Sequence, residues 1–233
     1  MNRALTAPRR LRAGTLGLTV AATGLIGGLA ATPAAAAAPA TVNVVHGIPG
    51  VAVKVCVDGK AVTDNFRYGN TIVGATLPAT RHRVRVVAAG KPCRATAILK
   101  SAYTLAAGDN YTIVANLNAG GTPNLKAFVN NVRPTREGKA RLTVRHTAKA
   151  PAVNVRTRGT KIIGGTHFTW GKSATLAVHA GTYKVKVTLP GSRKPVIGPA
   201  SKHLAAGRAY QVYAAGSPGH YRLITIKIPV GSR

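Results

Sequence analysis

The sequence predicts an all-β protein: two tandem immunoglobulin-like β-sandwich domains behind an N-terminal signal peptide. Three observations lead to this fold class. After residue 41, apolar residues alternate with polar ones, glycine and proline interrupt the runs about every ten residues, and the second half of the chain repeats motifs of the first. Alternation is typical of strands with one buried face. Evenly spaced turns that bound about seven or eight short strands per repeat are typical of a sandwich.

Residues 1–40 have the pattern of an export signal. Arginines precede an apolar, uncharged stretch from Thr15 to Ala31, which is short and glycine-rich for a stable membrane span. Small residues then offer a signal peptidase its cleavage site. A general secretory signal is favoured over the twin-arginine alternative that Arg9 and Arg10 suggest, because the residues after them fit that signal poorly.

The remainder of the chain predicts a secreted product. No second apolar run of membrane length follows the leader, and residues 228–233 carry neither an anchor helix nor a sorting motif. We therefore expect the mature protein outside the membrane, with no transmembrane span. It is either secreted and extracellular or associated non-covalently with the cell wall.

Repeated motifs define the two domains. The strand start at residues 42–46 recurs at 142–146, and three further motifs recur at similar spacing: Phe66-Arg67-Tyr68-Gly69 as Phe168-Thr169-Trp170-Gly171, Val84-Arg85-Val86 as Val185-Lys186-Val187, and the Leu-Ala-Ala-Gly turn of 105–108 as that of 204–207. Proline and glycine interrupt the pattern between the repeats. We therefore predict a first sandwich at 41–133, a short linker at 134–139 and a second sandwich at 140–233.

Several of these motifs resemble a known family. They are Val-Val-His46-Gly-Ile-Pro with its counterpart Val-Arg-His146-Thr-Ala-Lys-Ala-Pro, the turn Val57-Asp58-Gly59-Lys60, and the two Leu-Ala-Ala-Gly turns. The family is the domain of unknown function numbered 4397, found in exported actinobacterial repeat proteins, and the resemblance extends over essentially the whole mature chain. It implies sandwich repeats in secreted or envelope proteins and implies no established activity. Relatives often carry Asp where this chain has Lys or Arg, so the resemblance does not support an acidic or calcium-binding role.

The mature chain is strongly basic. The whole sequence has 33 lysines and arginines against 4 acids, and loss of the leader's four arginines leaves a net charge of about +25. Most cationic side chains therefore have no acidic partner and must be solvated. A hydrophobic content of 45% with regular alternation argues for a folded core despite this charge.

The candidate binding residues are cations on the predicted outer faces of strands. Arg83 and Arg85 alternate with inward valines on one strand, and Lys184 and Lys186 do so on its counterpart. In the second domain four more arginines are expected to join them: Arg141, Arg145, Arg156 and Arg158. If neighbouring strands of one sheet carry such residues, their outer face forms a basic plate.

A basic plate would bind an anionic wall polymer or polysaccharide by counterion release. Two alternatives stay open. The charge can serve solubility or acid surroundings alone, without a dedicated partner. The protein can also be a secreted nucleic-acid-binding protein, which would need base-stacking aromatic residues on an exposed face.

Cys56 and Cys93 both lie in the first repeat. In an exported protein the expected state of such a pair is a disulfide. Closing a loop of roughly 40 residues would stabilise the fold by about 4 kcal/mol on the chain-entropy model. A metal site is the alternative, but no His or Cys stands near either thiol at metal-ligand spacing. No metal and no cofactor are therefore predicted.

No catalytic residue is predicted. The chain has no Gly-x-Ser-x-Gly motif and no phosphate-binding loop. Asp58, the Asp64-Asn65 pair and Asp109 are each interpreted as turn residues, where aspartate bonds to the local backbone, rather than as paired catalytic carboxylates. A non-enzymatic interaction or structural protein is therefore preferred, and a hydrolase ranks third.

Two histidines and four aromatic residues are candidate binding groups. For His46 and His146 we expect a partly buried imidazole that bonds to a backbone carbonyl of the following turn, rather than a metal ligand. Phe66, Tyr68, Phe168 and Trp170 could form a stacking platform for sugars or bases. Their matched positions in the two repeats favour packing instead.

Overall fold

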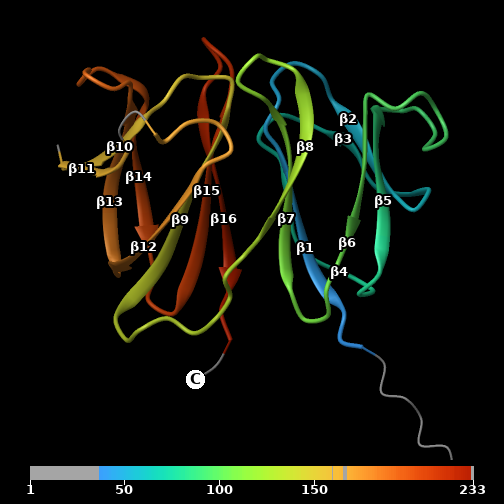
Figure 1. Cartoon of the computed structure of the whole chain (residues 1–233), viewed down its shortest axis with the longest axis horizontal. Helices are drawn as coiled ribbons and strands as arrows, with labels where there is room; N and C mark the ends of the chain where they lie inside the picture. The colour runs from blue at the N-terminus through green and yellow to red at the C-terminus, as the bar shows by residue number, and fades with distance from the viewer. Residues whose placement is uncertain (1–36, 159, 165–166, 232–233) are drawn as a thin grey trace, which may run out of the picture. The chain divides into compact units, whose positions relative to one another are not determined.

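The computed structural model describes residues 37–158, 160–164 and 167–231. In these ranges every regular element is a β-strand (Figure 1), which confirms the predicted all-β class and its tandem sandwiches. Residues 1–36, which hold nearly all of the predicted signal peptide, lie outside the described residues.

The first sandwich consists of β1 to β8, shown from blue to green in Figure 1. One sheet has the strand order β4-β1-β7-β8 and the other the order β3-β2-β5-β6. Strands β1 and β7 pair in parallel, and the other pairs are antiparallel. The bounds are β1 Ala40–His46, β2 Val53–Val57, β3 Lys60–Phe66, β4 Thr71–Leu77, β5 Arg81–Ala88, β6 Leu99–Thr104, β7 Asn110–Leu117 and β8 Pro123–Val129.

The second sandwich repeats this plan with β9 to β16. Its sheets have the orders β12-β9-β15-β16 and β11-β10-β13-β14, and β9 again pairs in parallel with β15. The bounds are β9 Lys139–Ala148, β10 Asn154–Thr157, β11 Thr160–Ile163, β12 Ser173–His179, β13 Gly181–Thr188, β14 Pro195–Leu204, β15 Arg208–Gly216 and β16 Arg222–Pro229.

Each sandwich has its own core, built by the alternation visible in the sequence. In the first, Val53 and Val55 of β2 and Val84 of β5 pack against β1 and β7 of the facing sheet. The second core has the corresponding valines Val155 and Val185. Polar neighbours of these valines are left on the outer faces of the sheets, because successive side chains of a strand point to opposite sides.

The Asp58-Gly59 turn joins β2 and β3 as predicted. Both residues have positive φ, 49° and 81°, which is the conformation of a two-residue type I′ hairpin and the reason for Asp-Gly there. The predicted turn at Asp64-Asn65 is wrong. Both residues lie inside β3, where the register with β2 shifts and Asn65 has a φ of 51°. The chain accommodates positive φ here as a bulge rather than as a turn.

The repeated Leu-Ala-Ala-Gly turns have a common hydrogen bond. The backbone N–H of Ala106 donates to the hydroxyl of Tyr111 at 3.1 Å, and that of Ala205 donates to the hydroxyl of Tyr210 at 2.9 Å. Each tyrosine therefore ties the turn to the strand that follows it. This bond explains why a tyrosine recurs at the same distance after both turns.

A third apolar cluster lies where the two sandwiches meet, within the single compact unit that the described residues form. Val45 and Val114 come from the first sandwich, and Tyr213 and Ile224 come from the second. Strands β7 and β15 are consequently buried along nearly their whole length. A strand buried on both faces loses the alternation of buried and exposed residues, and these two strands bury polar side chains as well, among them Thr112 and Asn116 in β7 and Gln211 in β15.

Candidate anion-binding surface

The first basic face lies on the outer side of the sheet β3-β2-β5-β6. It consists of Arg81, Arg83 and Arg85 of β5 with Lys100 of β6. The three arginines alternate with buried residues and therefore share one side of the strand, about 6.8 Å apart. Lys100 stands directly opposite Arg85 in the antiparallel ladder. Arg81, Arg83 and Lys100 are exposed, and Arg85 is half-buried.

The second basic face lies on the outer side of the sheet β11-β10-β13-β14. It consists of Lys184 and Lys186 of β13 with Arg156 of β10. Arg156 is the direct cross-strand neighbour of Lys186. Lys184 is exposed, and the other two are half-buried. Each sandwich thus has neighbouring strands of one sheet that carry outward cations.

The four predicted residues are therefore brought together in pairs. Arg83 and Arg85 belong to one sheet, while Lys184 and Lys186 belong to a sheet of the other sandwich. A basic plate requires outward cations on neighbouring strands of one sheet. Each sandwich has such cations, on β5 and β6 in the first and on β10 and β13 in the second. The structure provides two such plates rather than one that holds all four residues.

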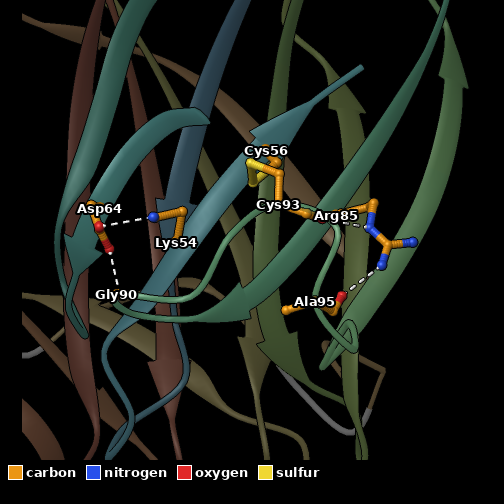
Figure 2. Close-up of a disulfide and its surroundings, with 7 residues drawn as sticks. All are labelled: Lys54, Cys56, Asp64, Arg85, Gly90, Cys93 and Ala95. Carbon is orange, nitrogen blue, oxygen red and sulfur yellow. Dashed lines mark hydrogen bonds and ion pairs between the residues drawn. A yellow bond between two sulfur atoms is a disulfide. The ribbon is translucent and has the colours of Figure 1, made fainter. Parts of the chain in front are cut away.

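Arg85 has a structural contact that the sequence did not suggest (Figure 2). Its Nε donates to the carbonyl oxygen of Cys93 at 3.1 Å, and its Nη2 donates to that of Ala95 at 2.8 Å. Cys93 is joined to Cys56 by the predicted disulfide, with the Cα atoms 5.9 Å apart, and Cys56 pairs with Arg85 across the ladder. The guanidinium and the disulfide together hold the loop between β5 and β6 on the sheet.

An acid holds the other end of the same loop. Asp64 accepts a hydrogen bond from the backbone N–H of Gly90 at 3.0 Å and lies 3.1 Å from Nζ of Lys54 (Figure 2). The bond from Gly90, and secondly the contact with Lys54, hold the pKa of Asp64 below its ordinary value. Asp64 is thus engaged within its own sheet and does not neutralise the first basic face.

Three of the four arginines expected on the second plate, Arg141, Arg145 and Arg158, lie elsewhere. Arg145 is buried where the sandwiches meet: its Nη1 donates to Oδ1 of Asn130 at 2.8 Å and to the hydroxyl of Tyr213 at 2.9 Å, and its guanidinium stacks 4.5 Å from the ring centroid of Phe128. Burial lowers the pKa of Arg145. Val45, the residue of the first repeat that aligns with Arg145, is buried in the apolar cluster between the sandwiches. The alignment of the two repeats is therefore the sequence feature that could have indicated the burial of Arg145.

Arg141 is engaged with the linker. Its Nη1 donates to the carbonyl oxygens of Asn131 at 3.1 Å and Arg133 at 2.7 Å. These bonds fix the chain between β8 and β9. Arg158 is exposed at the turn between β10 and β11, with a φ of 47°. Of the four added arginines, Arg156 is the one that belongs to the second basic face.

His46 and His146 are structural, as expected. His46 Nε2 lies 3.2 Å from the carbonyl oxygen of Val51, and His146 Nε2 lies 2.9 Å from that of Pro151. The backbone N–H of Ile48 donates to Nδ1 of His46, which fixes the neutral tautomer with its proton on Nε2. Burial lowers the pKa of both imidazoles.

His82 is a titratable group whose partners the sequence pattern does not indicate. Its Nδ1 lies 2.6 Å from Oδ2 of Asp58, and its Nε2 lies 2.8 Å from the carbonyl oxygen of Pro78. Burial alone would lower the pKa of His82, but the bonds to Pro78 and Asp58 together outweigh it and raise that pKa. An Asp-Gly turn followed by a strand histidine was the available signal, but the ladder position that joins them is not visible in the sequence.

The aromatic residues pack rather than form an exposed platform. Phe66 and Phe168 are buried in the two cores and lie near the rings of His46 and His146 respectively. Trp170 donates from Nε1 to Oδ1 of Asn116 at 3.1 Å. The prediction that aromatic residues at matched positions of the two repeats serve in packing is therefore confirmed for Phe66 and Phe168.

In the part of the chain that the structure describes, no three His, Cys, Asp or Glu side chains are grouped so as to hold a metal ion. No helix in that part is long and apolar enough to cross a membrane.

The fold and these faces define a tandem β-sandwich protein with basic outer sheets. The chain belongs to the family described as Domain of unknown function (DUF4397), the family that the sequence motifs indicated; its model matches residues 40–156, which is less than the whole mature chain over which the motifs extended the resemblance. A comparison with curated proteins gives no match. Among solved structures, the chain is similar at 10% identity and a TM-score of 0.24 to a carbohydrate-binding module from Eubacterium rectale Amy13K, solved with maltoheptaose. The match covers 83% of this chain and 98% of that one.

Proposed function

We propose that the protein is an exported, non-enzymatic binding protein that holds anionic polymers of the cell envelope, a wall polymer or an acidic polysaccharide, against its two basic faces. The observation that carries this proposal is the first basic face, where exposed Arg81, Arg83 and Lys100 lie on neighbouring strands of one sheet. On this proposal the protein acts outside the cell, free or associated with the wall.

Like charges on neighbouring strands repel one another. An anion that binds to such a face relieves this repulsion and therefore stabilises the folded protein. The protein itself supplies few anions. The whole chain has 4 acids, and Asp58 and Asp64 are already bonded, to His82 and to Lys54 with Gly90. A polymer with regularly spaced negative charges would supply several counter-charges at once.

Binding of this kind is driven by the release of condensed counterions from the polymer. It is independent of monomer sequence and weakens steeply as salt rises. Two faces on one chain also offer two attachment points, so a long polymer that reached both would bind more tightly than either face alone.

The proposal is tested with immobilised anionic wall polymer and the mature chain. The triple substitution Arg81→Gln, Arg83→Gln, Lys100→Gln removes three charges from the first basic face and leaves Arg85 to hold its loop. A matched control removes three exposed charges elsewhere: Lys172→Gln, Arg208→Gln, Lys227→Gln. We expect the face variant to be eluted at clearly lower salt than the control.

Equal elution of the two variants would show that net charge alone binds, without a dedicated face. Retention of the wild type that salt does not change would exclude the electrostatic mechanism. Tighter retention on DNA than on wall polymer of equal charge would favour the nucleic-acid alternative instead.

A further inference from the structure

The interior of the first sandwich contains an apolar cavity of about 160 Å³. Both sheets line it, among others through Val44, Val55, Val84, Ile113 and Leu125. Protein interiors are close-packed, and voids larger than a water molecule are few. A cavity of this size between two sheets is therefore a feature that packing alone does not explain.

The polar side chains in the cavity wall direct their polar atoms to partners of their own. His46 bonds to Val51 and Ile48, and His82 bonds to Asp58 and Pro78. The hydroxyl of Tyr103 donates to the carbonyl oxygen of Leu125 at 3.0 Å. A buried water needs two to four polar partners, so this space is a poor site for water and for any ion.

The rim of the cavity is apolar as well. Val51, between β1 and β2, is 60% exposed, and Ile98, just before β6, is 49% exposed, yet both also line the cavity. The backbone of Ile98 is held by a bond from its N–H to the carbonyl oxygen of Val86 at 2.8 Å. Exposed apolar side chains that continue into an apolar cavity form an entry path for an apolar group.

We infer that the first sandwich binds a small uncharged hydrocarbon group, a short alkyl chain or a single aromatic ring, between its sheets. The volume suits this class, since an apolar cavity of about 150 Å³ lined by aliphatic side chains stays dry and takes up benzene. The site is separate from the basic faces, which lie on the outer sides of the sheets, and it extends the proposed function to a second class of ligand.

The second sandwich provides a matched comparison. It contains a cavity of about 150 Å³, in which Val185 occupies the place that Val84 has in the first. Its wall also includes Thr157 and Thr225, whose buried hydroxyl groups make no hydrogen bond among the described residues, whereas the polar groups in the first cavity's wall have partners. An uncharged hydrocarbon should therefore prefer the first cavity.

The test uses the mature chain with benzene as the probe, followed by NMR of the valine, leucine and isoleucine methyl groups. We expect saturable shifts at Val44, Val55 and Leu125, with much smaller shifts at Val185 and Val212. Val84→Phe places a ring in the first cavity and should abolish the shifts there. Val185→Phe fills the second cavity and should leave them unchanged.

Absence of saturable shifts in the first cavity of the wild type would overturn the inference, whatever the variants do. Shifts that persist in a folded Val84→Phe protein would also overturn it. If Val84→Phe does not fold, competition decides: 1-hexanol must displace benzene from the wild type, and failure to do so contradicts a shared hydrocarbon site. None of these outcomes depends on polymer binding.

Discussion

His82 lies between two acceptor oxygens: its Nδ1 is 2.6 Å from Oδ2 of Asp58, and its Nε2 is 2.8 Å from the carbonyl oxygen of Pro78. These two acceptors favour the charged imidazolium, and the hydroxyl of Thr80, 3.3 Å from Nε2, can donate to that nitrogen when the ring is neutral. His46 has the opposite arrangement, because the N–H of Ile48 requires an unprotonated Nδ1. The pKa values of two buried histidines of the first sandwich are thus shifted in opposite directions, that of His82 upward and that of His46 downward.

The first prediction concerns Asp58→Asn. Because the pKa of His82 is raised in the folded state, His82 contributes stability that is fully present below its unfolded pKa of about 6.5 and is lost as pH rises through the folded value. The variant should lower the His82 pKa in an NMR titration and cost about 1 kcal/mol of unfolding free energy at pH 6, less at pH 9. Glu137→Gln is the control, and an unshifted His82 titration would refute the pairing.

The second prediction concerns His146, whose contribution to stability depends on pH in the opposite direction to that of His82. Its pKa is lowered by burial, so its contribution to stability is present above about pH 6.5 and is lost as pH falls through the folded value. The wild type should lose up to about 1.4 kcal/mol per pH unit from this group in that window. Denaturant unfolding at pH 7.5 and pH 5 should show a smaller difference for His146→Gln. An equal difference in both proteins would mean that His146 does not titrate with unfolding.

The third prediction separates two neighbouring arginines of the first basic face. Arg85→Gln removes both hydrogen bonds to the loop that carries Cys93, and we expect a loss of about 2 kcal/mol together with faster reduction of the disulfide by dithiothreitol. Arg83→Gln, its matched control, should stay within about 0.5 kcal/mol of the wild type. Equal reduction rates in the two variants would show that Arg85 does not hold the loop.

The fourth prediction concerns the repeated turns. Tyr111→Phe and Tyr210→Phe each remove one hydroxyl that accepts from an alanine N–H. Each variant should lose about 1 kcal/mol of unfolding free energy, and amide exchange at Ala106 or Ala205 should accelerate in the corresponding repeat only. Unchanged exchange at both alanines would contradict the proposed role of these bonds.

Much of the fold was predictable because it rests on local rules. Alternation around Val53 and Val84 identified the strands, and Asp58-Gly59 identified a hairpin whose positive φ angles demand those residues. The carbonyl bonds of His46 and His146 followed from their position at a strand end before a turn. Such features depend on a few consecutive residues.

The contacts of individual cations were not predictable in the same way. Arg83, Arg85 and Arg145 each stand next to a buried valine, yet Arg83 is exposed, Arg85 holds a loop and Arg145 is buried between the sandwiches. What distinguishes them is the ladder register and the loop or sheet that covers each face. These depend on residues far apart in the chain, which a pattern of period two does not encode.

The central claim is that outward cations on neighbouring strands bind anionic polymers. The most direct measurement is the salt dependence of the association constant for polyphosphate of defined length, compared between the wild type and the Arg81→Gln, Arg83→Gln, Lys100→Gln variant. We predict a linear, negative slope of log K against log salt that becomes shallower by about 2 to 3 in the variant, roughly one per charge removed. The same slope in both proteins would contradict the account.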